Sequence, residues 1–418
     1  MTILPPLVYM PGFLREHFAV LEGFTTDLVL LALCAWGASA LIASRDMTLP
    51  LSLVLAAVRV GVPALYFAWY FDATWNLTDD LVYAAQGREL LNCGYNPFTV
   101  LLYDHGRGYL QTLSQGHHVL YGWWNLLAMS VFGEHYYAPV FLNVVVSFVG
   151  GSLLARTIRQ LGFSAGYCLG LQIFWLLHWD LIAWSSLLNI KDVLVQTLTI
   201  AILYCLVNFI VQRKTRFLVG FLVVAQLFWW IRFYVPVIVL TAVMIWMLTQ
   251  WNDSRKYLFI PLGALAFYFM APLISGVKDY WQFDTIFYGA IRFTLTPIPW
   301  NVDPVYEYLV IPTSLHWLAF IPALIGAGFL WTESKHARLF FIYLACLVGL
   351  YAITEDLLGP RQRFQVAFLF AWAQFHFAWK MQPGVSVAAA SNLHVEPLPG
   401  AWHLPAGRQM AAYEGNTA

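Results

Sequence analysis

Apolar segments of a length that can cross a lipid bilayer recur along most of this 418-residue chain. The composition, 60% hydrophobic and 11% charged, agrees with an integral membrane protein. We therefore predict an all-α polytopic membrane protein with about 11 transmembrane helices, and at most about 13, because each span needs about 20 mostly apolar residues. The predicted spans lie near residues 27–44, 50–71, 137–158, 163–183, 193–211, 217–230, 233–248, 257–274, 314–331, 339–353 and 364–379.

A shorter apolar segment, Val119–Phe132, decides the predicted orientation of the chain. Cytoplasmic connections are enriched in Lys and Arg. If this segment lies against the membrane without crossing it, the basic connections alternate regularly, with the N-terminus outside and the C-terminus inside. The cytoplasmic side then holds Arg45, Arg156, Arg159, Arg213, Lys214, Arg216, Arg255, Lys256, Lys335, Arg338 and Lys380.

No polar segment of the chain is long enough to form a soluble domain. We expect residues 1–380 to form one transmembrane domain with two external loops, 72–118 and 277–312, and residues 381–418 to form a disordered cytoplasmic tail. A formal net charge of zero gives no indication of a nucleic-acid partner. The 5 cysteines are scattered, so we expect neither disulfides nor a zinc site.

The first external loop contains the densest acidic group of the chain. Its sequence from Asp72 to Phe98, DATWNLTDDLVYAAQGRELLNCGYNPF, predicts a short amphipathic helix, with Thr78 or Asp79 as N-cap and an end at Gly94. Acidic residues in a first turn interact favourably with the helix dipole. Asp79 and Asp80 are therefore either capping residues or functional carboxylates, and the residues alone leave both interpretations open.

Basic residues also occur at the ends of several predicted spans that we expect to be external, although Lys and Arg are usually enriched on the cytoplasmic side. Cations kept there are candidates for binding an anion, although pairing with nearby carboxylates or contact with headgroups explains any single one equally well. This set comprises Lys191, which precedes Asp192, and Arg232, Arg361 and Arg363.

Arg59 lies in the middle of the second predicted span. An ionisable side chain at that depth is costly unless it is paired or hydrated. We expect Arg59 to pair with Asp180 or to line a cavity, in a mainly structural role.

Four motifs occur in a distinctive order along the chain. The acidic pair Asp79 and Asp80 is followed by Tyr83, a small residue and the loop GYNPF. The stretch GHHVLYGWWNLLAMSVFGEHYYAPVFLN comes next, then NIKDVLVQTLTI and finally GPRQRFQVAF. Over residues 72–211 the first three motifs resemble the GT-C membrane glycosyltransferases, in the branch of the protein O-mannosyltransferases and lipid A aminoarabinose transferases, and GPRQRFQVAF near the last predicted span resembles them faintly. Val119 and Leu120 stand where that branch has two prolines.

The resemblance implies an inverting transfer of a sugar from a polyprenyl-phosphate carrier to a hydroxyl of a lipid, glycan or protein, at the outer face of a bacterial plasma membrane. Such a displacement needs a base for the acceptor proton and cations for the phosphate. By resemblance the base is Asp80, or else Asp79, and we expect Asp80→Asn to leave stability nearly unchanged because the loop is at the surface. The expected substrate-binding residues are Tyr83, His117, His118, Lys191, Asp192, Arg232, Arg361 and Arg363.

Other functions stay open at this level. A polysaccharide polymerase or ligase of the O-antigen type also uses polyprenyl carriers and external arginines, with its main loop in the second half, where residues 277–312 lie. A flippase or transporter of lipid-linked sugars would often have internal repeats and interrupted helices, and no repeat is evident. We expect no dedicated metal site, although a carboxylate pair serves equally as a base or as a ligand for a divalent cation.

Overall fold

The computed structural model describes residues 25–72, 75, 77–116, 118–249, 257–258, 260–265, 268, 286–353 and 359–382. The regular structure within these residues is helical, apart from an isolated bridge between Ile298 and Asn301. His117, half of the predicted span 257–274 and the predicted tail beyond residue 382 lie outside the described residues.

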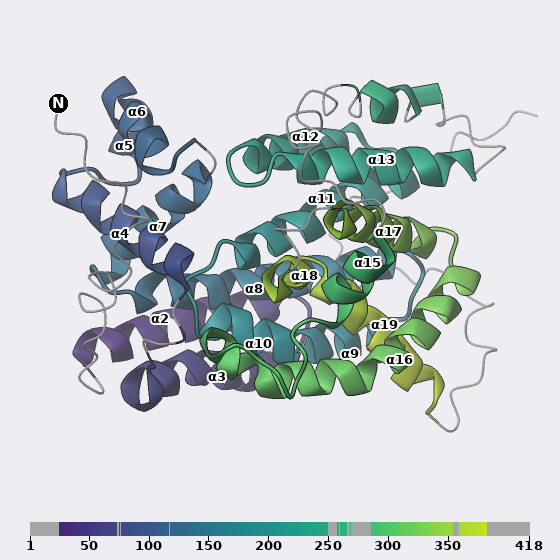
Figure 1. Cartoon of the computed structure of the whole chain (residues 1–418), viewed down its shortest axis with the longest axis horizontal. Helices are drawn as coiled ribbons and strands as arrows, with labels where there is room; N and C mark the ends of the chain where they lie inside the picture. The colour runs from purple at the N-terminus through teal and green to yellow at the C-terminus, as the bar shows by residue number, and fades with distance from the viewer. Residues whose placement is uncertain are drawn as a thin grey trace, which may run out of the picture. The chain divides into compact units, whose positions relative to one another are not determined.

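Figure 1 follows the helices along the chain. The first half contains α2 (Thr26–Ala43), α3 (Leu49–Leu65), η2 (Tyr66–Tyr70), α4 (Thr78–Asn92), α5 (Thr99–Leu102), α6 (Asp104–Leu113), α7 (Val119–Phe132), α8 (Tyr137–Gln160), α9 (Ala165–Leu176) and α10 (Trp179–Ser186). The second half contains α11 (Asp192–Gln212), α12 (Thr215–Trp229), α13 (Tyr234–Leu248), α15 (Ile286–Leu295), η5 (Pro304–Leu309), α16 (Val310–Glu333), α17 (Ala337–Ala352), α18 (Pro360–Phe364) and α19 (Ala367–Lys380).

Several of these helices are long and apolar enough to cross a membrane. Within the described residues there are 5: Thr26–Ala43, Leu49–Tyr70, Tyr137–Gln160, Asp192–Gln212 and Pro304–Glu333. The shorter apolar helices, such as α12 and α13 with 15 residues each, are roughly 22 Å long, against about 30 Å for the hydrocarbon core of a bilayer. The chain is therefore a helical membrane protein, and the described residues do not establish the predicted number of spans.

The outer surfaces of these helices agree with contact to lipid. Large apolar side chains are exposed along the lengths of α2, α3, α12 and α16, where a soluble protein would place polar ones. They include Leu30, Leu33, Leu41, Val54, Val58, Val219, Leu222, Val223, Leu318, Ile321 and Leu324. The buried faces of the same helices form the protein core.

Charged residues pair according to the sides predicted for them. Arg156 Nε lies 3.0 Å from Asp46 Oδ1, and Lys380 Nζ lies 2.8 Å from Glu333 Oε1. Both basic residues belong to the set predicted to be cytoplasmic. Arg232 and Arg361 of the set predicted to be external pair with Asp79 and Asp192, which the sequence places on the same side. These contacts agree with the predicted alternation, whereas the identity of the outer face stays a prediction.

Two segments differ from the sequence prediction. The predicted span 163–183 is not one continuous helix, because it contains two helices, α9 and α10, that are interrupted at Leu177 and His178. His178 is the N-cap of α10 and accepts a hydrogen bond from the backbone N–H of Asp180 at 3.3 Å. The apolar sequence continues through the interruption, so hydropathy alone does not reveal it.

The predicted first external loop, residues 72–118, contains the expected helix as α4 (Thr78–Asn92), with a different start. The N-cap is Leu77, not Thr78 or Asp79, and Asp80 accepts a hydrogen bond from the backbone N–H of Leu77 at 3.1 Å. The predicted end is confirmed, because Gly94 adopts a φ of +78°, a conformation that glycine tolerates best. α4 packs against α7, beside it in Figure 1.

Arg59 is fully buried in α3, but its partners are not those predicted. It donates to the hydroxyl groups of Ser185 at 2.6 Å, Ser186 at 3.2 Å and Ser147 at 3.4 Å. Asp180 is not among the described partners of Arg59, because α10 presents its C-terminal serines to Arg59, whereas Asp180 at its N-terminal end lies beside Arg363. Neutral hydroxyl groups thus solvate this buried cation.

α16 and α19 approach each other closely at a glycine. A Cβ atom placed on Gly326 would clash with the carbonyl oxygen of Ala373 in α19. Gly328, two residues further along α16, has no atom within 4 Å of the same position. The packing of these two helices therefore requires glycine at residue 326 only.

We expect Gly326→Ala to push α16 away from α19 and to lower the free energy of unfolding by about 1–3 kcal/mol. Gly328→Ala is the matched control and should leave stability unchanged or raise it, since alanine favours helix formation. Thermal unfolding of both variants in detergent measures the difference. Equal unfolding temperatures for the two variants would contradict the close approach.

Cys93 provides a test of the orientation. It is exposed at the C-terminal end of α4, so a membrane-impermeant thiol reagent should label it in intact cells and should not label Cys93→Ser. A cysteine introduced as Lys335→Cys, at an exposed position in the predicted cytoplasmic set, should react only after permeabilisation. The reverse pattern would show that the loop faces the cytoplasm.

Candidate functional site

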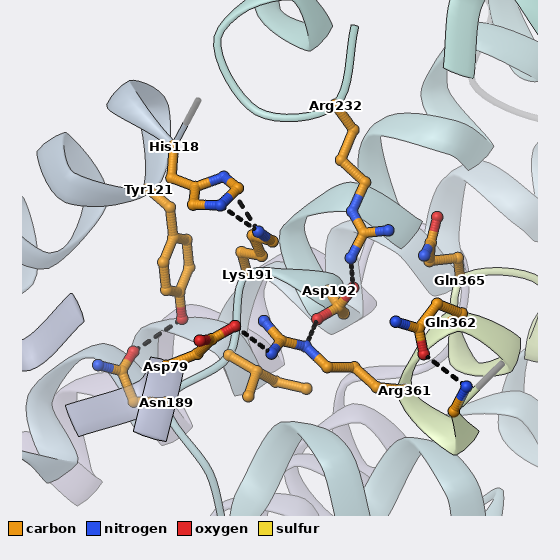
Figure 2. Close-up of polar contacts among 12 residues, drawn as sticks. Asp79, His118, Tyr121, Asn189, Lys191, Asp192, Arg232, Arg361, Gln362 and Gln365 are labelled. Atoms are coloured by element: carbon orange, nitrogen blue, oxygen red, sulfur yellow. Dashed lines mark hydrogen bonds and ion pairs between the residues drawn. The ribbon is translucent and has the colours of Figure 1, made fainter. Parts of the chain in front are cut away.

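A chain of ion pairs joins four segments of the protein that are separated in sequence. Arg361 in α18 donates from Nη1 to Asp79 Oδ2 at 2.6 Å and from Nε to Asp192 Oδ2. Asp192, the first residue of α11, accepts from Arg232 Nη2 at 2.5 Å through its other oxygen. Figure 2 shows Arg361 between the two carboxylates, with Arg232 approaching from the opposite side.

Lys191 lies beside this chain and has a different partner. Its Nζ lies 2.8 Å from Nε2 of His118 and 5.6 Å from the centre of the Tyr83 ring. The Tyr83 and Tyr121 rings meet edge to face at 4.9 Å. Among the described residues, no carboxylate lies within ion-pair distance of Lys191. We call Asp79, Lys191, Asp192, Arg232 and Arg361 the charged cluster.

The electrostatics of the cluster indicate a deficit of negative charge. Burial, with the charges of Arg232 and Arg361, holds the pKa of Lys191 well below its usual value. Burial and the charge of Lys191 lower the pKa of His118 to about 3, so its imidazole is neutral and accepts a hydrogen bond from the ammonium group. Two arginines and Lys191, whose protonated form these effects disfavour, face two carboxylates, and a bound anion would favour protonation of Lys191 and complete the pairing.

Asp79 is the accessible carboxylate of the cluster. Its side chain is 53% exposed, whereas that of Asp192 is completely buried. Burial acts to raise the pKa of Asp79, but the charge of Arg361 and its hydrogen bond outweigh burial and keep the pKa below its usual value. Asp79 is therefore ionised at neutral pH.

Asp80, the first choice of base from the sequence, does not join the cluster. The expectation that it lies at the surface is wrong, because its side chain is 0% exposed. Oδ2 accepts from the backbone N–H of Leu77 at 3.1 Å and from the hydroxyl of Tyr136 at 3.0 Å. Burial raises the pKa of Asp80 to about 8, so at neutral pH it is mostly protonated and holds the start of α4 in place.

Arg363 also lies away from the cluster, although only one residue separates it from Arg361. It is buried and donates from Nη1 to the carbonyl oxygen of Thr296 at 2.7 Å, while Nη2 lies 3.8 Å from Asp180 Oδ1. His178 and His316 lie 4.0 Å and 3.8 Å from the other oxygen of this carboxylate. These four residues form a second polar group, the inner cluster, between α10, α16 and α18.

A buried network of neutral polar side chains supports the loop that carries Lys191, and the sequence analysis missed it. Asn189 donates to Asn125 Oδ1 at 2.7 Å and to the backbone carbonyl of Asp80 at 3.2 Å. It accepts from the Tyr121 hydroxyl at 2.7 Å, and Asn143 donates to the backbone carbonyl of Ile190 at 3.2 Å. The sequence feature that could have indicated this network is the presence of asparagine side chains inside apolar segments, because such polar groups must find hydrogen-bond partners there.

Tyrosines fix the orientation of Arg232. Its Nη1 donates to the hydroxyl of Tyr234 at 2.6 Å and to that of Tyr351 at 2.9 Å. Gln365 donates to the same Tyr351 hydroxyl at 3.1 Å. Arg232 is thus held on both sides, by Asp192 and by two phenol groups, in a position fixed before any ligand binds.

The short helix α18 has local features that position Arg361. Proline at its first residue and a hydrogen bond from the Gly359 N–H to Gln362 Oε1 at 3.1 Å define its start. Gln196 of α11 donates to the carbonyl oxygen of Phe364 at 2.5 Å. α18 is therefore fixed to α11, the helix that supplies Asp192.

Of the residues predicted to bind substrate, the structure brings His118, Lys191, Asp192, Arg232 and Arg361 together with Asp79, and Tyr83 borders the group. Arg363 and Asp80 are placed elsewhere, and His117 is outside the described residues. No group of three or more His, Cys, Asp or Glu side chains in the described part of the chain is arranged to hold a metal ion. All 5 cysteines are unpaired.

Comparisons with known proteins give no relative for this chain. No protein-family model, no curated protein and no solved structure matches it.

The raised pKa of Asp80 predicts a pH-dependent stability. The folded pKa of about 8 exceeds the unfolded one, so the stabilising effect of the bound proton is full below about pH 4. It is lost as the pH rises to about 8.

Asp80→Asn cannot titrate, and its unfolding temperature should fall less than that of wild type between about pH 5 and about pH 9. Thermal unfolding in one detergent at both pH values measures this. Asp104→Asn removes an exposed carboxylate that pairs with Arg107 and should follow wild type. Parallel curves for wild type and Asp80→Asn would contradict the buried, protonated state.

Proposed function

We propose that this protein is an inverting membrane glycosyltransferase that moves a sugar from a polyprenyl-phosphate carrier to an acceptor hydroxyl. The observation that carries the proposal is the convergence of Lys191, Arg232 and Arg361 next to an exposed, ionised carboxylate, Asp79. The resemblance of the loop motifs to the GT-C superfamily supports the same reaction and a GT-C-like arrangement of about eleven spans.

The cations have the chemistry that a phosphate leaving group requires. Lys191 lacks a carboxylate partner among the described residues, and Arg361 presents a planar guanidinium suited to bidentate contact with phosphate. Arg232 is fixed by Asp192 and the tyrosine hydroxyl groups, so it stabilises charge through the field of the cluster without moving. Negative charge that builds on the departing phosphate oxygen is therefore balanced in a partly desolvated site.

Asp79 is the base in this proposal, in place of Asp80. The acceptor oxygen attacks the anomeric carbon, and the bond from that carbon to the phosphate oxygen breaks with its electron pair leaving on the phosphate. The acceptor proton passes to the Asp79 carboxylate. Asp80 is unsuited to this role because its carboxyl group is buried and mostly protonated at neutral pH.

The surroundings of the reaction follow from the substrate. A polyprenyl tail requires the bilayer, and the exposed apolar helices provide an intramembrane surface beside which it can lie. We infer that the site opens on the extracytoplasmic side of a bacterial plasma membrane, where the acceptor is a lipid, a glycan or a protein.

A second candidate function is transport of a lipid-linked sugar, and the inner cluster favours it. Interrupted helices and buried ionisable groups are common at the substrate and proton sites of transporters. The break between α9 and α10 carries His178 and Asp180 into such a group, with His316 and Arg363. A transporter would move the donor across the bilayer and leave the bond between sugar and phosphate intact.

The experiment is product formation by purified protein in lipid nanodiscs, with a panel of polyprenyl-phosphate sugars and cell-envelope acceptors. Wild type should release the carrier phosphate, and Asp79→Asn should slow transfer roughly 100-fold or more, as loss of a general base does. Asp80→Asn and the surface control Asp104→Asn should retain most of the activity. Loss with Asp80→Asn but not with Asp79→Asn would reverse the assignment of the base.

Release of carrier phosphate also separates the candidates. If no donor is consumed but labelled donor crosses the bilayer in proteoliposomes, the transporter is the correct function. Polymer formation from one lipid-linked oligosaccharide would instead identify a polymerase.

A further inference from the structure

Two carboxylates, Asp79 and Asp192, share the guanidinium group of Arg361. Its Nε is engaged by Asp192 and its Nη1 by Asp79, while Nη2 is buried and makes no hydrogen bond to the described residues. A guanidinium binds an anion in bidentate fashion through two neighbouring nitrogens. The Nε edge is occupied by Asp192, so the remaining edge is Nη1 with Nη2.

The two carboxylates on Arg361 differ in how firmly they are held. Asp192 is fully buried, opens α11 and binds Arg232 as well as Arg361. Asp79 is half exposed, and Arg361 is its one ion-pair partner among the described residues. Removing Asp192 from its partners would leave a buried charge unpaired, which is costly. Asp79 can turn toward solvent with little penalty, so it is the carboxylate that yields.

We propose that the anionic group of the donor and Asp79 compete for the Nη1–Nη2 edge of Arg361, so that binding of the anion releases the Asp79 carboxylate. This inference rests on the proposed function, and it defines how one site serves two roles. With no donor bound, Arg361 neutralises Asp79 and makes it a weak base. When the anion occupies Arg361 and Lys191, Asp79 is free to accept the proton of the acceptor hydroxyl.

The competition imposes an order on the reaction. The donor phosphate must bind before the base becomes available, so an acceptor or water that enters first meets a carboxylate already engaged by Arg361. The anion also restores the charge balance around Lys191, whose protonated form is disfavoured by burial and by the two neighbouring arginines. The release of Asp79 and the charge balance at Lys191 both result when the donor anion replaces the Asp79 carboxylate on Arg361.

The first test measures the binding of farnesyl phosphate, a short polyprenyl phosphate, to protein in detergent by calorimetry. Asp79→Asn removes the competitor and should bind roughly threefold tighter or more, an effect of the size measured for coupled neighbours. Asp104→Asn removes one negative charge from the exposed pair with Arg107 and should bind as wild type does. Equal or weaker binding by Asp79→Asn would overturn the competition.

A double-variant cycle separates competition at Arg361 from general repulsion between Asp79 and the ligand. In an Arg361→Gln background, Asp79 has lost its partner, so adding Asp79→Asn should change the affinity by less than about 1.5-fold. Repulsion through space would survive in that background and give the full effect. A full effect would therefore overturn the proposal even if the single variant binds more tightly.

Carbodiimide labelling of wild-type carboxyl groups, read by mass spectrometry, avoids variants altogether. Addition of farnesyl phosphate should increase modification of Asp79 and leave Asp104 unchanged. A decrease at Asp79 would mean that the ligand covers this carboxylate and would contradict its release.

The outcomes also distinguish this inference from the proposed function. If wild type binds farnesyl phosphate and transfers sugar but Asp79→Asn binds no more tightly, only the competition fails. If neither wild type nor Asp79→Asn binds the probe, the anion site fails and the proposed function fails with it.

Discussion

The ion pairs of Arg361 are the interaction on which the rest of the site depends. This one side chain connects Asp79, 282 residues away in sequence, with Asp192 at the start of α11. Charges that are withdrawn from water must be paired, and an apolar helical protein offers few alternatives. Folding is therefore linked to assembly of the charged cluster, because Arg361 of α18 pairs with one carboxylate from α4 and with another from α11.

The sequence predicted most of the cluster because charged residues are rare in a membrane protein and each requires an explanation. Lys191, Asp192, Arg232 and Arg361 were all assigned to one side by the alternation of basic connections, and the structure groups them. The sequence did not show which of two charged residues close together in the chain belongs to the site. Successive helical residues differ in direction by about 100°, so choosing Asp79 over Asp80, or Arg361 over Arg363, requires knowing which face each helix buries.

The helical segments followed from hydropathy, whereas interruptions and polar contacts inside them did not. The break at His178 lies within a continuous apolar run, and the serines around Arg59 carry no charge that a sequence pattern would indicate. The same reason hides the network around Asn189, which is built of neutral residues on separate helices. Neutral polar groups in apolar segments are recognised only once their partners are known.

A structure determined by cryo-electron microscopy in nanodiscs, with a polyprenyl phosphate added, tests the central claim most directly. The account predicts phosphate density between Lys191 and the Nη1–Nη2 edge of Arg361, with Asp79 turned away from Arg361 and Asp192 still bound to it. Phosphate density at the inner cluster, or no density near Arg361 with ligand bound elsewhere, would contradict it.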